Sequence, residues 1–271
     1  MNTSQIMQTA LKMAGLRKTP ADSEVHVPGE NIRKILMAID VTGAELVYAK
    51  QHGYDLVIAH HPMGGSARLF GHKVFKTHVD LMLKMGIPRK VAEKTIAPKL
   101  RSLEVMNHIA NYDQSVALAK QLGLTCMSIH TPCDIIGRNV FRQNLERNMP
   151  KKGAKVADVV KALHKIPEFQ KAKTKIEVRL GSPRNRAGKV AVVFGAYTNG
   201  GYDVARTYFD HGVSTVIYIH VLDADLEKLR KDGKGNLVVT GHIASDWIGL
   251  NRLAGELTIS GMSITKLTDI L

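Results

Sequence analysis

The sequence contains few cysteines, few aromatic residues and no long hydrophobic run. Cys126 and Cys133 are the only cysteines, and their spacing is not that of a paired motif. This excludes a disulfide-stapled framework and favours a reducing, cytoplasmic setting. No apolar stretch approaches the ~20 residues that span a bilayer, and residues 1–16 fit an amphipathic first helix better than a signal peptide. We therefore expect a soluble, cytoplasmic protein without a membrane partner.

Acidic residues are also scarce: 24 Asp and Glu stand against 38 Lys and Arg, which gives a net charge of +14. Such a charge makes nucleic acid or another polyanion a possible partner. The basic residues are nevertheless spread along the chain, and the aromatic residues, 5% of the total, do not alternate with them. A platform that stacks single-stranded bases is therefore poorly supported. Solvated lysine and arginine faces explain the charge equally well.

The 271 residues, 44% of them hydrophobic, suffice for one large α/β domain or two lobes. Residues 32–39 are typical of a core strand, and Thr42 with Glu45 forms the pattern of a helix-capping box. The helix that follows ends near Gly53, and residues 56–59 are typical of a buried strand. A strand, a helix and a strand joined by short connections predict a mainly parallel α/β sheet.

The remaining sequence extends this α/β pattern into a second lobe. We expect lobe 1 over about residues 1–165, a polar junction over about 166–187, and lobe 2 over about 188–271. Lobe 2 begins with an expected strand at 189–194, followed by others at 213–219 and 237–239. The expected fold class is two α/β lobes with mixed or mainly parallel sheets and a metal site between them, at the C-terminal ends of the strands. Residues 19–29 are expected to be a loop, and 92–122 and 135–165 long helical regions.

Histidine and aspartate follow three of the expected strands. His60 and His61 come directly after residues 56–59, and chance alone nearly accounts for one such pair among twelve histidines. The same arrangement recurs, however, after the strands at 125–129 and 237–239. It supplies the candidate metal ligands His60, His61, Asp134, His242 and Asp246, with His130 beside them as the candidate catalytic residue.

Three imidazoles and two carboxylates exceed the needs of one tetrahedral site. Such a set suits two divalent ions ~3.5–4 Å apart, which activate a bridging water in many phosphoester and amide hydrolases. Zn, Mn, Fe and Ni all remain open, since mixed nitrogen and oxygen ligands accept each of them. His72, His78 and His220 are weaker candidates for the same pocket.

Four segments together resemble the Nif-three-like dinuclear-metal family, whose members are often called GTP cyclohydrolase I type 2 homologues. The segments are residues 35–42, 55–62, 130–134 and 240–246, and the His-His-Pro sequence at 60–62 is the most specific. The resemblance implies two metal ions held between α/β lobes and a homo-oligomer built as a hexameric ring. It also implies that His60, His61, Asp134 and His242 are ligands, with Asp246 standing where the family has Glu.

Two classes of function follow from these observations. The first is a metal-dependent hydrolase that acts on a phosphoester, a nucleotide or a cyclic amide. The alternative is a non-enzymatic, ring-forming metal-binding or regulatory protein that binds nucleic acid through its basic surface. The metal-dependent hydrolase is the leading hypothesis of the two.

Overall fold

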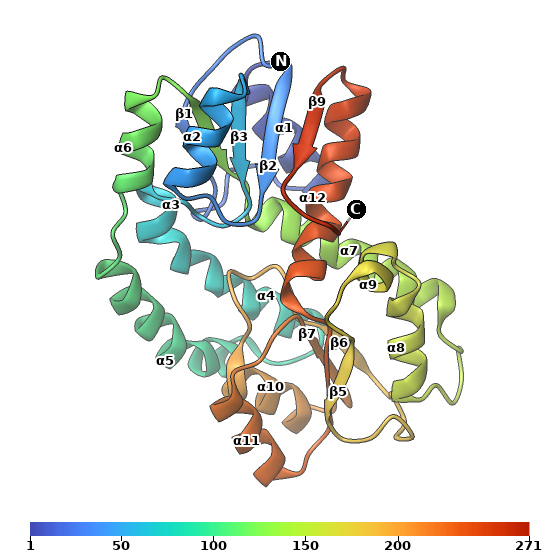
Figure 1. Cartoon of the computed structure of the whole chain (residues 1–271). Helices are drawn as coiled ribbons and strands as arrows, with labels where there is room; N and C mark the ends of the chain where they lie inside the picture. The colour runs from blue at the N-terminus through green and yellow to red at the C-terminus, as the bar shows by residue number, and fades with distance from the viewer. Residues whose placement is uncertain (271) are drawn as a thin grey trace. The chain divides into compact units, whose positions relative to one another are not determined.

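The computed structural model describes residues 1–270, and the chain divides into two α/β units (Figure 1). The first unit comprises Met1–Val74, Ser102–Ile136 and Asp246–Asp269. The second comprises Phe75–Arg101 and Gly137–Ser245, together with Ile270. Each unit contains one sheet of mainly parallel strands, which confirms the expected α/β class.

The first unit has a five-stranded sheet in the order β1-β4-β3-β2-β9. Its strands are β1 (Glu24–Val27), β2 (Lys34–Ala38), β3 (Leu56–Ala59), β4 (Thr125–Ser128) and β9 (Ser263–Lys266). Strands β4, β3, β2 and β9 are parallel, whereas β1 pairs with β4 in the antiparallel direction. The start of β1 therefore lies at the end of the sheet where the other four strands have their C-terminal ends.

Two helices cover one face of this sheet. Helix α2 (Gly43–Gln51) begins at the predicted capping box, in which the Thr42 amide donates to Glu45 Oε2 at 2.7 Å. Helix α6 (Gln114–Gln121) packs beside it. The two helices bury apolar side chains against the strands in one core cluster, which includes Leu36, Leu46, Ala49, Val57, Ala119 and Cys126. The remaining helical segments that lie wholly within this unit are α1 (Thr3–Ala14) and α3 (Gly65–Phe70).

Two expected helical regions are interrupted, and one expected loop contains a strand. Helices α5 (Arg89–His108) and α6 are separate, and so are α7 (Thr131–Asn148) and α8 (Val156–His164). Pro150 lacks the N–H that a helix interior needs, and Gly153 adopts a φ of 68°, so the chain between α7 and α8 leaves the helical conformation. Strand β1 lies within residues 19–29, which the sequence pattern had placed in a loop.

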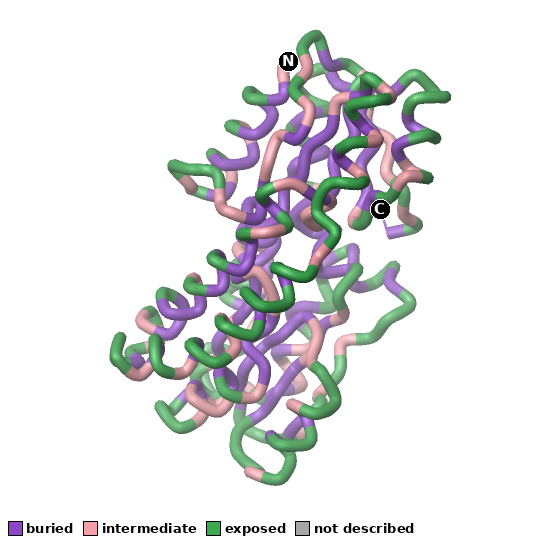
Figure 2. Tube along the Cα trace, turned by 90° about the vertical axis from the view of Figure 1, so that its left-hand side faces the viewer, coloured by how far each residue is buried: buried purple, intermediate pink, exposed green. Residues whose placement is uncertain are grey.

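The second unit has a four-stranded sheet in the order β5-β8-β7-β6. Its strands are β5 (Glu177–Leu180), β6 (Val190–Val192), β7 (Thr215–Tyr218) and β8 (Asn236–Val239), with β5 antiparallel at one edge and β6 parallel at the other. Besides α8, its helices are α4 (Thr77–Lys84), α9 (Pro167–Lys171), α10 (Gly201–Asp210) and α11 (Asp223–Asp232). The central strands β2, β3, β4, β7 and β8 are almost wholly buried, whereas the edge strands are more exposed. Figure 2 shows buried stretches of the chain, in purple, within both units.

Four helical elements contain a point where the chain passes from a segment of one unit to a segment of the other. They are the 3-10 helix η1 (Gly71–Lys76), α5, α7 and α12 (His242–Ile259). Across residues 1–270, no helix combines the length and apolar character needed to cross a bilayer.

His78 makes the stability of the second unit depend on pH. Its ring is fully buried on α4, where Nε2 donates to the Thr198 carbonyl at 3.0 Å and the ring packs edge-on against Phe75. Burial lowers the pKa of His78 from 6.5 to about 4. Between these pH values the unfolded chain binds a proton that the folded chain does not, so stability present above pH 6.5 is lost as the pH falls toward 4. The loss reaches roughly 3 kcal/mol at most.

We expect His78→Gln to weaken this dependence, because its amide can still donate to Thr198 but does not titrate. The measurement is urea unfolding of the metal-free protein at pH 7.5 and pH 4.5, for wild type and variant. Equal losses of unfolding free energy in the two proteins would show that His78 is not responsible.

Candidate metal centre

The C-terminal end of β3 carries two imidazoles, those of His60 and His61. The backbone ladder between β3 and β2 continues past the strand, since the His60 amide donates to Ala38 O and the His61 amide to Ile39 O, both at 2.9 Å. These bonds hold the backbone of both residues against the neighbouring strand. Pro62 has no N–H to extend the ladder, and the chain leaves the sheet.

The end of β4 delivers His130, and α7 begins one residue later. The His130 amide donates to Ser23 Oγ at 3.0 Å, which fixes the chain between strand and helix. Asp134 lies in the first turn of α7, where its backbone amide donates to His130 O at 3.1 Å. A carboxylate in this position is favoured by the positive end of the helix dipole. Asp246 comes from α12, one turn after His242, the first residue of that helix.

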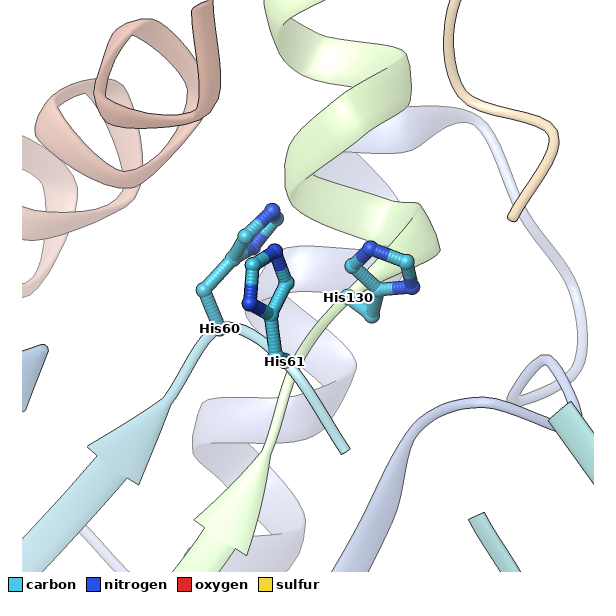
Figure 3. A group of neighbouring side chains, drawn as sticks. All are labelled: His60, His61 and His130. Atoms are coloured by element: carbon cyan, nitrogen blue, oxygen red, sulfur yellow. The ribbon is translucent and has the colours of Figure 1, made fainter. Parts of the chain in front are cut away.

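The side chains of these residues converge within the first unit. His60 Nε2 lies 3.2 Å from Asp134 Oδ1 and 3.7 Å from Asp246 Oδ2. His61 Nε2 lies 3.4 Å from Asp246 Oδ2, and His130 Nε2 lies 3.7 Å from Asp134 Oδ2. Figure 3 shows the three imidazole rings gathered beyond the ends of β3 and β4. His60, Asp134 and Asp246 are 0%, 4% and 2% exposed, so this polar cluster is almost fully removed from water.

Each of the three imidazoles is anchored through its Nδ1 atom. His61 Nδ1 lies 2.8 Å from Asp40 Oδ1, and His130 Nδ1 lies 2.8 Å from Asp22 Oδ2. His60 Nδ1 lies 3.3 Å from the carbonyl oxygen of Ile129. An acceptor at Nδ1 holds the proton there and leaves Nε2, the atom that faces the cluster, with a lone pair for a metal ion. This is the arrangement that orients metal-binding histidines in proteins.

The electrostatics of the cluster are dominated by burial and by its carboxylates. Burial lowers the pKa of His60 to about 3, so its imidazole is neutral. Burial acts in the same direction on His61, but Asp246 and Asp40 outweigh it and raise the pKa to about 10. Asp134 and Asp22 similarly outweigh burial at His130 and raise its pKa. The buried carboxylates thus favour positive charge on or near these rings. A bound metal cation could provide that charge in place of protons.

The donor set could hold a metal ion. Ligand atoms lie within 4.8 Å of one another in the group His60, His61 and His130, and also in the group His60, Asp134 and Asp246. His60 Nε2 makes no hydrogen bond within residues 1–270, although it is buried and faces two carboxylates. A buried polar atom without a hydrogen bond is costly unless another partner binds it. These buried groups could hold a metal ion.

Among the other candidate histidines, His242 offers a ring nitrogen within 4.8 Å of ligand atoms of His61 and Asp246, whereas His72, His78 and His220 have other partners. His242 is exposed at the start of α12, and its ring contacts that of His220 with 4.8 Å between centroids. His220 Nδ1 lies 2.8 Å from Asn199 Nδ2. His72 Nδ1 lies 3.2 Å from Leu69 O, and His78 belongs to the core of the second unit. The assignment of His242 as a metal ligand stays a prediction.

Sequence reasoning missed the two carboxylates that anchor His61 and His130. Asp40 follows β2, so the strand-end rule that selected the histidines would also have found it. Asp22 precedes β1, and its placement depends on β1 running antiparallel to β4, with Glu24 opposite Ser128. Because the sequence predicts a loop over residues 19–29, it gives no reason to place Asp22 near the C-terminal ends of β3 and β4.

A solved structure from Sphaerobacter thermophilus, described as a NIF3 superfamily protein, is similar over the whole molecule. Its sequence is 42% identical, the match covers 100% of this chain and 99% of that one, and the TM-score is 0.97. The chain belongs to the NIF3 superfamily. The family model for Duf34/NIF3 (NGG1p interacting factor 3) also matches residues 22–86, which include Asp22, Asp40, His60 and His61. The expected family resemblance is confirmed.

More distant structures share the fold of this NIF3 superfamily member. Reduced HcgD from Methanocaldococcus jannaschii is 14% identical with a TM-score of 0.59, and the match covers 98% of each chain. The protein TTHA1606 from Thermus thermophilus is 13% identical with a TM-score of 0.54, and the match covers 99% of this chain and 98% of that one. At these identities the likeness concerns the fold alone. Among curated proteins, no similar sequence was found.

Proposed function

We propose that the protein is a metal-dependent hydrolase that holds two divalent ions at the strand ends of its first unit. The observation that carries the proposal is the convergence of imidazole Nε2 atoms on two buried carboxylates, with His61 and His130 anchored from behind by Asp40 and Asp22. Isolated buried carboxylates are costly, and a cation with fixed ligands offsets that cost.

In this proposal His60, His61, Asp134 and Asp246 bind the ions. His242 is included because it lies one turn before Asp246 on α12, a spacing at which two side chains of a helix are neighbours. Asp246 stands where the family resemblance implies Glu and is one methylene shorter. Asp246 would therefore hold a metal ion with a shorter reach from α12 than a Glu at this position.

Two divalent ions would lower the pKa of a bound water and polarise an oxygen of the substrate. The protein's own groups orient the reactants and handle protons. The buried walls around His60 exclude bulk water, and Asp40 keeps the His61 ring in one orientation. His130, held at Nδ1 by Asp22, is the proposed general acid: in its doubly protonated form it would donate the Nε2 proton to the leaving group and return to the neutral ring. The substrate class is a phosphoester, a nucleotide or a cyclic amide.

The oligomeric state belongs to the same proposal. The family resemblance supports a homo-oligomer, specifically a hexameric ring. Light scattering on the purified protein tests this, and a monomer in dilute solution would contradict it.

The test of hydrolysis separates metal binding from proton transfer. We expect His130→Asn to retain the wild-type metal content but to lower kcat by about 100-fold, the usual contribution of a general acid. Turnover is measured with bis(4-nitrophenyl) phosphate, a nucleoside triphosphate and a cyclic amide, after loading with Zn, Mn, Fe or Ni. Metal content is measured on the same samples.

Two outcomes would contradict the assignment. Loss of metal from His130→Asn would make His130 a ligand and remove its role as a general acid. Absence of turnover on every substrate with the site fully loaded would favour a non-enzymatic metal-binding protein instead.

A further inference from the structure

The net positive charge of the chain is concentrated in one stretch of the second unit, where acidic residues are scarce. Residues 147–189 contain thirteen Lys and Arg but only three Asp and Glu, so they carry ten of the fourteen net charges. All thirteen basic side chains are exposed. Within residues 1–270, only Arg179 among them takes part in an ion pair, with Glu177. The excess charge is therefore a local feature of this surface.

Two loops of this stretch lie side by side. The first, residues 149–155, joins α7 to α8, and the second, residues 181–189, joins β5 to β6. The Ala187 amide donates to the Ala154 carbonyl at 2.8 Å, which ties one loop to the other. We call residues 149–155 and 181–189 the basic loop pair. Because backbone hydrogen bonds hold the two loops together, their side chains form one surface.

The basic loop pair contains six cationic residues and no acidic one. Lys189 is held by the protein itself, since its Nζ donates to Met85 O at 2.7 Å. None of the six forms an ion pair within the described part of the chain. The positive field of this surface is therefore uncompensated and favours an anion. The six are Lys151, Lys152, Lys155, Arg184, Arg186 and Lys189.

Two of these cations stand directly opposite each other. Lys155 and Arg186 are partners in an isolated antiparallel β-bridge. Like charges in directly opposite positions of an antiparallel pair destabilise the fold. The neighbouring acid, Asp158, accepts from the Lys155 backbone amide at 2.8 Å and forms no ion pair with either side chain within residues 1–270. A local arrangement that costs stability is typical of a functional surface, and a bound polyanion would remove the cost.

The surroundings of the loops distinguish between kinds of polyanion. Residues 147–189 expose no large apolar side chain of the kind that inserts into a membrane interface. Their only aromatic residue, Phe169, is 1% exposed, so no base of a single strand can stack on it. Attraction to phosphate groups is what remains. Duplex nucleic acid offers about one phosphate charge per 1.7 Å of its axis, a density that suits several cations on two adjacent loops.

We propose that the basic loop pair binds the phosphate backbone of double-stranded nucleic acid, with Lys151, Lys152, Lys155, Arg184 and Arg186 each contacting a phosphate. Contacts of this kind fix position but carry no information about base sequence. The site lies wholly within the second unit, and it does not rest on the hydrolase activity proposed above.

The first experiment measures the salt dependence of binding. A fluorescently labelled 20-bp DNA duplex is titrated with the full-length, metal-loaded protein between 50 and 200 mM NaCl, and the anisotropy is recorded. Five phosphate contacts predict a slope of about −4.5 for log K against log salt, and thus affinity about 500-fold weaker at the higher salt concentration. No binding at 50 mM NaCl, or an affinity independent of salt, would overturn the proposal.

The second experiment removes two cations from one loop. The double variant Lys151→Ala, Lys152→Ala is expected to reduce the slope to about −2.7 and to weaken binding at 100 mM NaCl by at least about 10-fold. The matched control is Lys228→Ala with Lys231→Ala. These lysines are exposed on α11, a helix that also carries four acidic residues. Equal weakening by both double variants would assign the effect to overall charge and contradict the site.

The third experiment compares partners. Vesicles containing phosphatidylserine are added at the same total phosphate concentration as the duplex, and we expect binding to them to be at least 10-fold weaker. A second duplex of unrelated sequence should bind as tightly as the first. Tighter binding to vesicles would make this a membrane surface, and a strong preference for one duplex would require base contacts. Either result would overturn the proposal.

The fourth experiment tests the opposed charges of Lys155 and Arg186. Arg186→Gln keeps the length of the side chain and removes the repulsion, so the unliganded protein should unfold about 1–3 °C higher in 20 mM salt. The difference should vanish in 1 M salt, which screens exposed charges. A lower unfolding temperature in 20 mM salt would remove the uncompensated charge on which the proposal rests. Metal content is measured for every variant, and its constancy separates this surface from the metal centre.

Discussion

Asp134→Asn is expected to lower the affinity for divalent metal by at least about 100-fold. Asp134 is 4% exposed, and its two carboxylate oxygens face His60 Nε2 and His130 Nε2 at 3.2 and 3.7 Å. Asparagine preserves the shape but removes one negative charge, and it offers a single neutral oxygen in place of two. Changing even a residue behind a ligand typically costs 10- to 100-fold in metal affinity, and Asp134 is itself a proposed ligand.

Metal content is measured by mass spectrometry after dialysis against a weak chelator. Asp80→Asn makes the same chemical change at an exposed position of α4 and is the matched control. Wild type and Asp80→Asn should retain the same metal, whereas Asp134→Asn should lose most of it. Equal content in all three proteins would mean that the buried carboxylate does not bind metal.

Gly249→Ala is expected to destabilise the first unit by about 3 kcal/mol, the upper part of the usual range for overpacking. A Cβ atom at Gly249 would overlap the backbone carbonyl of Cys133, so α12 and the start of α7 pack there backbone to backbone. A carbonyl cannot rotate away as the end of a side chain can, and the helices would have to separate. Asp134 and Asp246 lie next to this contact along α7 and α12, so the same change should weaken metal binding.

Gly255 supplies the matched control on the same helix. It is exposed, and a Cβ atom there meets no other atom within 4 Å. Gly255→Ala should therefore stabilise the protein by up to about 1 kcal/mol, because alanine is the better helix former. The two variants are compared by denaturant unfolding of the metal-free protein. Similar effects from both would refute the close packing at Gly249.

The sequence predicts most of the strands because their apolar runs are short and end in clear turn signals. Residues 56–59 are an example, since four apolar residues leave a polar turn and end at His60. The sequence does not predict strand β1, because the polar residues Glu24 and His26 make up half of it and leave no apolar run. Its pairing with β4, rather than its own composition, makes it a strand.

The candidate ligands could be predicted from position, but the orientation of their rings could not. The strand-end rule selects His60, His61 and Asp134, and the structure brings their side chains together. The direction of each imidazole depends on an acceptor at Nδ1. Those acceptors, Asp22 and Asp40, come from segments far away along the chain, and only the tertiary structure relates them to the histidines.

Anomalous diffraction from crystals of the metal-loaded protein tests the central claim most directly. Data collected on both sides of the absorption edge of the bound metal locate each ion and identify its element. The proposal predicts two anomalous peaks in the cluster bounded by His60, His61, Asp134 and Asp246. A single peak there, or none at full metal loading, would contradict it.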